Sequence, residues 1–179
     1  MRKILLIVFI MLLTACSKVN YYKTPNELLL SIKDYSCKMK ISYFSNKNSN
    51  TYLATQTYSA LGKYSMEFFD DHKLKINYEN TTLNISSDNS KLTIVNSSHY
   101  ELNENPLFLS YFINTYFNTE ESNIIKTDEN SIYLKLPNIN EYLFSAKLEL
   151  NNNLPYSLTY FDKNGNAKIN IIYSEFTFI

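Results

Sequence analysis

The sequence of 179 residues has few glycines, one arginine, two cysteines and no tryptophan. The glycines are Gly62 and Gly165, so glycine-rich phosphate loops of the Walker and dinucleotide-binding types are excluded. The single arginine, Arg2, leaves the rest of the chain without the planar group that grips phosphates bidentately. Seventeen basic residues balance seventeen acidic ones, which argues against nucleic-acid binding through bulk positive charge.

Hydrophobic residues, by contrast, are plentiful at 45%, and charged residues make up 19%. That composition is sufficient for a packed core and is not that of a disordered chain. The length fits one ordinary domain, and no glycine- or proline-rich linker divides it.

The amino terminus has the pattern of an export signal. Arg2 and Lys3 precede an uninterrupted apolar run, Ile4–Leu13. As a helix this run is about 15 Å long, half of a hydrocarbon core, so we interpret it as a signal-peptide segment and not as a membrane span.

A cysteine follows small residues directly after the apolar run, in a tetrapeptide that resembles the bacterial lipobox: Leu13, Thr14, Ala15 and Cys16. The alternative is a chance cysteine behind an apolar stretch. We expect residues 1–15 to be removed and Cys16 to carry acyl chains that hold the protein on a membrane. The expected organisation is a signal peptide (1–15), a lipidated tether (16–23) and one domain (24–179), on the extracytoplasmic face of the cell membrane.

The remainder of the sequence predicts an α+β domain. Thr24, Pro25 and Glu27 have the pattern of a capped helix start, and an apolar helix that should be buried on most sides is expected at Leu107–Phe117. Elsewhere apolar and polar residues alternate with the period of strands, and Asn164-Gly165 predicts a type I′ hairpin. The expected strands are 35–43, 51–61, 63–69, 73–78, 81–86, 91–95, 131–136, 142–150, 155–162 and 167–178.

Three segments carry a resemblance to a known family: Tyr35-Ser36-Cys37-Lys38-Met39, Gly62-Lys63-Tyr64-Ser65-Met66-Glu67-Phe68 and Leu154-Pro155-Tyr156-Ser157-Leu158-Thr159-Tyr160-Phe161-Asp162. In this order, after a signal and a capped helix, they resemble the LolA/LolB-like superfamily of lipoprotein carriers. Within it the chain is most similar to the clostridial spore-germination lipoprotein GerS and its paralogues. The resemblance implies a single antiparallel sheet curved into an open half-barrel, with an N-terminal helix and a buried apolar helix (about 106–117) over its concave face.

The resemblance also implies a function. GerS-like proteins are understood as non-catalytic helpers of a cortex peptidoglycan-modifying amidase, an N-acetylmuramoyl-L-alanine amidase, needed for spore germination. That would place the protein on the spore membrane facing the cortex, and open sheet edges would permit a homodimer by strand exchange. The alternative is a carrier-type lipoprotein that binds a lipid or acyl chain. Carriers of this fold use an arginine near the cavity, and no arginine follows Arg2 here.

The apolar inner face of the sheet is the candidate binding site, either as a concave pocket or as a packed core. Its residues alternate along the expected strands, with two phenylalanines of the apolar helix above them. The set is Met39, Ile41, Met66, Phe68, Leu74, Ile76, Leu92, Ile94, Phe108, Phe112 and Leu134.

Few residues offer catalytic or metal chemistry. Asp70-Asp71-His72 has the composition of an ordinary turn between strands. A metal site needs three or four converging ligands, which this segment alone does not supply. Cys37 paired with His72 or His99 lacks an identifiable third residue to orient the base. We therefore expect no enzyme activity, catalytic residue, metal or cofactor. Cys37, the cysteine left after Cys16, is expected to be either a small buried hydrophobe or one half of an intermolecular disulfide.

Overall fold

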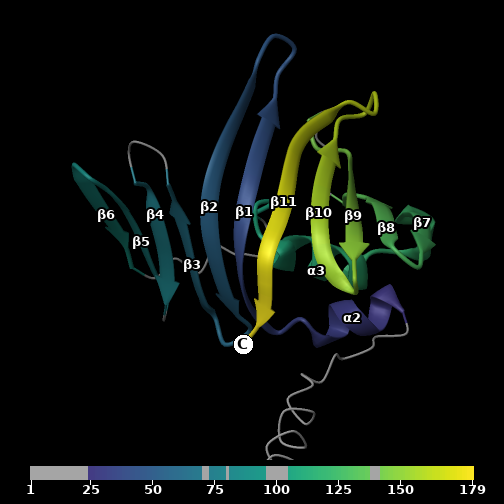
Figure 1. The fold of residues 1–179 in the computed structure, drawn as a ribbon, viewed down its shortest axis with the longest axis horizontal. Helices are drawn as coiled ribbons and strands as arrows, with labels where there is room; N and C mark the ends of the chain where they lie inside the picture. Colours follow the sequence, from purple (N-terminus) through teal and green to yellow (C-terminus); the bar gives the residue numbers. More distant parts are fainter. Residues whose placement is uncertain (1–23, 70–72, 80, 96–104, 138–141) are drawn as a thin grey trace, which may run out of the picture.

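The computed structural model of the chain describes residues 24–69, 73–79, 81–95, 105–137 and 142–179 (Figure 1). Eleven strands in these ranges form one sheet, in the order β6-β5-β4-β3-β2-β1-β11-β10-β9-β8-β7, and all neighbours are antiparallel. The sheet is curved and not closed, with β6 and β7 as its two free edges (Figure 1). The predicted open half-barrel of the α+β class is confirmed.

The strands are bounded as follows: β1 (Asp34–Phe44), β2 (Ser49–Ser59), β3 (Lys63–Phe68), β4 (Lys75–Glu79), β5 (Thr82–Ser87), β6 (Ser90–Ile94), β7 (Ile124–Asp128), β8 (Ser131–Lys135), β9 (Ser145–Asn151), β10 (Leu154–Phe161) and β11 (Ala167–Phe178). The α-helices are α2 (Pro25–Ser31) and α3 (Leu109–Asn118), and a short 3₁₀ helix, Glu121–Asn123, precedes β7. All expected strands are present with small shifts of their ends, and β7 is an additional strand.

Helix α2 begins where the sequence predicts it. The Thr24 side chain accepts a hydrogen bond of 3.2 Å from the Glu27 backbone N–H, and Pro25 occupies the first turn, where no N–H is needed. Leu28 and Leu29 are buried in the core beneath the sheet. The helix therefore closes one end of the half-barrel (Figure 1).

Strands β1 and β11 join the two halves of the chain at the centre of the sheet. Met39 lies opposite Tyr173 and Ile41 opposite Ile171, and all four side chains are buried. Along β1 the buried residues alternate with half-buried or exposed ones, as a strand with one face on a core requires. The register is therefore specified by the burial pattern, because a shift of one residue would turn the apolar set outward.

The hairpin between β10 and β11 is present, but its turn is not type I′. That turn needs positive φ at both central residues, whereas in the connection Asp162–Asn166 only Gly165 has positive φ, at 80°. The Asp162 carboxylate organises the turn instead, because it accepts backbone hydrogen bonds of 2.9 Å from Asn164 and from Asn166. Such side-chain to backbone bonding is typical of aspartate in turns.

Helix α3 lies behind the sheet in Figure 1, across the central strands. Leu109, Phe112 and Ile113 are buried against the sheet, whereas Phe117 is 40% exposed. The exposed residues of the helix, Phe117 and Asn118, lie at its C-terminal end, and the other residues are buried or half-buried. The expectation that this helix is buried on most sides is therefore confirmed.

Candidate functional site

Several candidate residues lie outside the described ranges: the lipobox Leu13, Thr14, Ala15 and Cys16, and the pair His72 and His99. The expected lipid anchor therefore stays a prediction from the sequence. The described domain begins at Thr24, directly after the expected tether.

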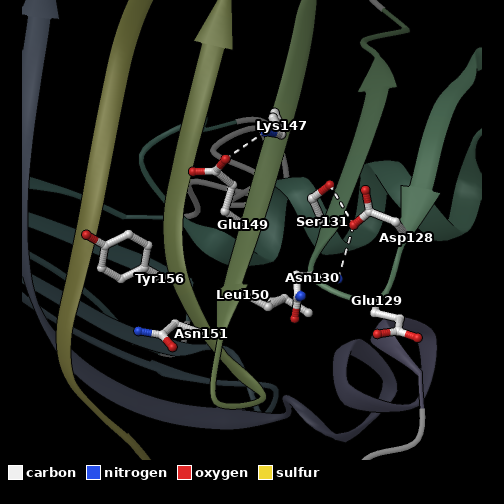
Figure 2. A pocket seen from close by; sticks show the side chains of 9 residues that line it. All are labelled: Asp128, Glu129, Asn130, Ser131, Lys147, Glu149, Leu150, Asn151 and Tyr156. Atoms are coloured by element: carbon white, nitrogen blue, oxygen red, sulfur yellow. Dashed lines mark hydrogen bonds and ion pairs between the residues drawn. The ribbon is translucent and has the colours of Figure 1, made fainter.

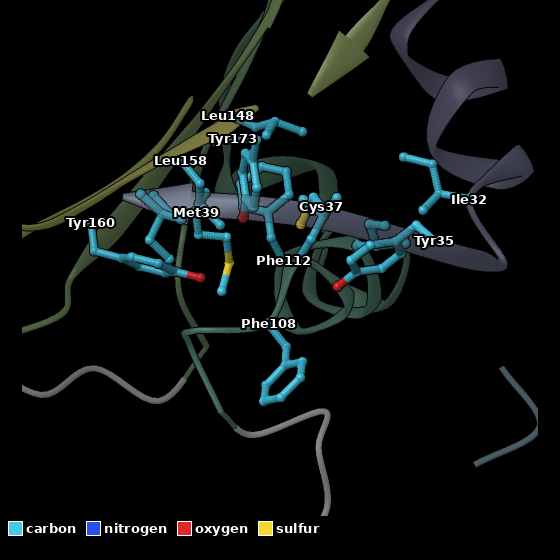
Figure 3. Close-up of a cluster of buried hydrophobic side chains, with 14 of the residues drawn as sticks. Ile32, Tyr35, Cys37, Met39, Phe108, Phe112, Leu148, Leu158, Tyr160 and Tyr173 are labelled. Atoms are coloured by element: carbon cyan, nitrogen blue, oxygen red, sulfur yellow. The ribbon is translucent and has the colours of Figure 1, made fainter. Parts of the chain in front are cut away.

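The structure brings most of the candidate apolar set together. Seven side chains are buried in one core cluster: Met39, Ile41, Met66, Phe68, Phe108, Phe112 and Leu134. Leu74 and Ile76 are partly buried against it, while Leu92 and Ile94 on β6 are exposed. Figure 3 shows Met39 and Phe112 within the cluster, and the Phe108 ring centroid lies 4.9 Å from that of Tyr64. Between the central strands and α3 these side chains fill the concave face.

The core under α3 also contains polar groups that sequence reasoning missed. The Tyr35 hydroxyl donates a hydrogen bond of 2.5 Å to the side-chain oxygen of Gln56, and the Gln56 amide donates one of 3.2 Å to the Leu107 carbonyl. These two hydrogen bonds connect β1 and β2 to the segment that leads into α3. Gln56 is fully buried and occupies an inward position of β2, so the strand period places it in the core although its side chain is polar.

Two further buried hydroxyls, those of Tyr160 and Tyr173, have no hydrogen-bond partner within the described part of the chain. Both rings lie among Met39, Phe112 and Leu158 in Figure 3. Burial raises the pKa of both phenols well above the ordinary value, so they stay protonated. A buried hydroxyl without a partner is costly, so these two groups mark a place where a polar atom would be favourable.

Cys37 lies on the concave side of β1 and is only 2% exposed. Burial raises its pKa to about 12, so the thiol is neutral and a poor nucleophile. An intermolecular disulfide through Cys37 would require the core to open locally.

The opposite, convex face carries an open hollow of about 750 Å³ over β7 to β10 (Figure 2). The Asp128 carboxylate accepts hydrogen bonds from Lys126, from the Asn130 backbone N–H and from the Ser131 hydroxyl at 2.9, 3.1 and 3.0 Å, and these contacts lower its pKa to about 2. The hollow therefore holds an ionised carboxylate that cannot act as a proton donor near neutral pH.

A second carboxylate in this hollow is held in the same way. Glu149 accepts a hydrogen bond of 2.6 Å from Lys147 and one of 2.8 Å from the Ser157 hydroxyl. Both contacts lower the pKa of Glu149, so it too stays ionised. The hollow is thus a polar surface with anchored charges, and neither carboxylate is a proton donor near neutral pH.

The two free edges of the sheet differ in how they are protected. Strand β7 has a register irregularity between Ile124 and Lys126, and an ion pair joins Lys126 to Asp128. Strand β6 pairs regularly with β5, and its inward-facing Leu92 and Ile94 are 54% and 40% exposed. Bulges and charges discourage pairing with another chain, so β6, which carries Lys91 but no register irregularity, is the less protected edge of the described sheet.

Neither α2 nor α3, the α-helices of the described ranges, has the length and apolar character needed to cross a bilayer. Among the described residues, no three histidine, cysteine, aspartate or glutamate side chains converge closely enough to hold a metal ion.

Similar folds occur in solved structures. One is the complex of the CwlD amidase from Clostridioides difficile with the GerS lipoprotein, which matches with 20% identity and a TM-score of 0.51 over 84% of this chain and 89% of that chain. An uncharacterized conserved protein from Thermus thermophilus matches with 9% identity and a TM-score of 0.50 over 87% and 83%. A LolA superfamily protein from Nitrosomonas europaea, NE2245, matches with 9% identity and a TM-score of 0.41 over 88% and 94%. At these identities the first two matches establish the fold alone.

The predicted likeness to GerS is thereby confirmed at the level of the fold. No curated protein matches the sequence. The family model described as "Sporulation protein YdcC-like" matches residues 1–178, almost the entire chain. The chain therefore belongs to the family of YdcC-like sporulation proteins.

Proposed function

We propose that the chain is a membrane-anchored, non-catalytic lipoprotein of a spore former. In this role it acts as a partner or activator of an amidase that modifies cortex peptidoglycan, and it is needed for spore germination. The observation that carries the proposal is membership of a sporulation family over residues 1–178. The fold supports it, because the similar structure with GerS was determined as a complex with the CwlD amidase.

The membrane anchor is assigned to Cys16, which leaves residues 16–23 as a tether of at most about 25 Å. The domain would then stay close to the lipid surface. Metabolic labelling with palmitate tests the anchor: wild type and Cys37→Ser should incorporate label, and Cys16→Ser should not. Equal labelling of Cys16→Ser and wild type would contradict it.

The partner surface is assigned to the β6 edge. Pairing with a strand of another protein would satisfy its unpaired backbone groups and cover Leu92 and Ile94. Leu92→Glu should therefore reduce capture of the amidase by tagged protein from sporulating cells. The matched control is Ile125→Glu on the other edge, where the replaced side chain is 45% exposed. Equal loss in both variants, or in neither, would argue against this edge.

The same edge bears on the oligomeric state. Exchange of edge strands between two copies would give the proposed homodimer. Light scattering of the purified full chain tests this, since Leu92→Glu should shift a dimer to monomer while Ile125→Glu should not. A monomeric wild-type chain would rule the homodimer out.

A second candidate function is binding of a lipid or acyl chain under α3, which would require the core side chains there to move apart. The hydroxyls of Tyr160 and Tyr173 favour it, because a ligand head group would supply the partner that they lack among the described residues. Native mass spectrometry of protein purified from cells should then show a bound lipid, and Tyr160→Phe should lower its occupancy. If no lipid is bound to the wild-type protein, this candidate is eliminated.

A further inference from the structure

The convex face of β2 to β6 carries a straight row of uncharged polar side chains. Residues directly opposite one another on neighbouring strands point to the same face of a sheet. The register pairs each member of the row with the next, from β2 to β6: Thr57, Ser65, Asn77, Asn84 and Thr93. We call this row the polar track; the strands that carry it, β2 to β6, form the left part of the sheet in Figure 1.

Hydrogen bonds within the track orient its two asparagines. The Ser65 hydroxyl donates to the side-chain oxygen of Asn77 at 2.7 Å, and the Thr93 hydroxyl donates to that of Asn84 at 2.8 Å. Both bonds engage the amide oxygen, so within the described ranges each amide keeps its two N–H donors for a ligand. Thr57 and Thr93 are exposed, and the three residues between them are half-buried.

Four charged residues beside the centre of the track form two ion pairs. Lys63 pairs with Glu79 on one side, and Lys75 pairs with Glu67 at 3.5 Å on the other. Charges also lie near the two ends, since Lys91 is on the same face as Thr93 and Asp34 lines a hollow at the other end. The centre of the track, where the charges compensate each other, is therefore suited to a neutral ligand rich in hydroxyl and amide groups.

One end of the track opens into an outer-face hollow of about 720 Å³, which Thr57, Ser65 and Asn77 line together with Asp34 and Lys63. Because neighbouring strands lie about 4.8 Å apart, the five positions span about 19 Å. The strand spacing is close to the length of one sugar in a β-1,4-linked chain. An extended glycan that crosses the strands would therefore place about one sugar over each polar position.

We propose that the polar track binds an uncharged β-1,4-linked amino-sugar chain directly, with one sugar over each strand. The acetamido and hydroxyl groups of such a chain match the amides and hydroxyls of the track. This goes beyond the proposed function, since it assigns the protein its own contact with a glycan and requires no amidase. It uses the convex face of β2 to β6, opposite to Leu92 and Ile94.

The test is calorimetric titration of the purified full chain with chitooligosaccharides, the neutral β-1,4-linked oligomers of N-acetylglucosamine. Affinity should rise with length from two to five sugars and then level off. The double variant Asn77→Ala/Asn84→Ala should bind chitopentaose about tenfold more weakly, as expected for the loss of two ligand hydrogen bonds. The variant Asn77→Asp/Asn84→Asp, which keeps the size of both side chains, should also weaken binding because it removes the donors.

Asn170→Ala is the matched control, because Asn170 donates a similar cross-strand hydrogen bond of 2.8 Å to Thr159 away from the track. Its affinity should equal that of wild type. No binding by wild type, affinity independent of length, or equal affinity in both double variants and wild type would each overturn the proposal. Amidase capture in the same variants separates the two hypotheses, since the glycan proposal can fail while capture persists.

Discussion

The two halves of the sheet follow the same alternation of apolar and polar residues but have different surroundings. Under α3, inward residues such as Leu134 and Leu158 are buried. In the arm formed by β4 to β6, the inward residues Leu92 and Ile94 of the edge strand remain exposed, whereas Leu83 of β5 is buried. The alternation therefore specifies which face a side chain occupies, and the elements around it decide whether that position becomes core. The covered half should supply stability, and the arm is free to supply contacts.

The largest effect on stability is expected when a core side chain of α3 is removed, and this tests the difference between the two halves most strongly. Phe112→Ala should lower the free energy of unfolding by about 3–5 kcal/mol, since it leaves a cavity between helix and sheet. Urea unfolding measures the change. Phe117→Ala on the same helix is the control, and at 40% exposure it should cost much less. Equal losses would mean that α3 is not the cover of the core.

A smaller effect is expected from the buried hydrogen bonds that join Tyr35, Gln56 and the Leu107 carbonyl under α3. Tyr35→Phe leaves the side-chain oxygen of Gln56 without its donor, which should cost about 1–3 kcal/mol. Urea unfolding again measures it. A stabilised Tyr35→Phe would show that this hydrogen bond does not hold the segment before α3 in place.

The covered half should also be sensitive to acid through its hairpin. Asp162 is almost buried, which alone would raise its pKa, but hydrogen bonds from Asn166, Lys168 and Asn164 lower it from 3.8 to about 2. The unfolded chain therefore binds more protons between these values, so this stabilisation is complete above about pH 4 and is lost as the pH falls toward 2.

Asp162→Asn should remove that contribution. The difference in unfolding free energy between wild type and variant should be constant near neutral pH and shrink between pH 4 and pH 2. Unfolding curves at several pH values measure it. A difference that does not change over this interval would contradict the assignment.

The smallest effect is expected in the arm. Ile94→Ala should change the free energy of unfolding by no more than about 0.5 kcal/mol, because the side chain is 40% exposed and lies on an edge strand. A loss as large as that of Phe112→Ala would show that the arm is part of the core, and the comparison would fail.

Much of this architecture could be predicted from local pattern. The alternation along β1, the Thr24 cap and the bounds of β11 follow from residue types and their spacing. Strand β7 was missed because Ile124-Ile125-Lys126 does not alternate and contains the irregularity in register. The turn at Gly165 differs because Asp162 supplies hydrogen bonds that the Asn-Gly rule does not include.

The site was less predictable than the fold. Leu92 and Ile94 were correctly placed on the inward face of a strand, but strand period does not reveal what covers that face. Gln56 was missed because its partners, Tyr35 and the Leu107 carbonyl, are 21 and 51 residues away in the sequence. The polar track depends on the register of five strands, which no single strand reveals.

The central claim is that the protein supports an amidase that modifies the cortex. The most direct measurement is the muramic-δ-lactam content of spore cortex after deletion of the gene, with wild-type and Cys16→Ser copies returned separately. The account predicts that lactam is lost on deletion, restored by the wild-type copy and restored less well by Cys16→Ser. Unchanged lactam in the deletion strain would contradict it.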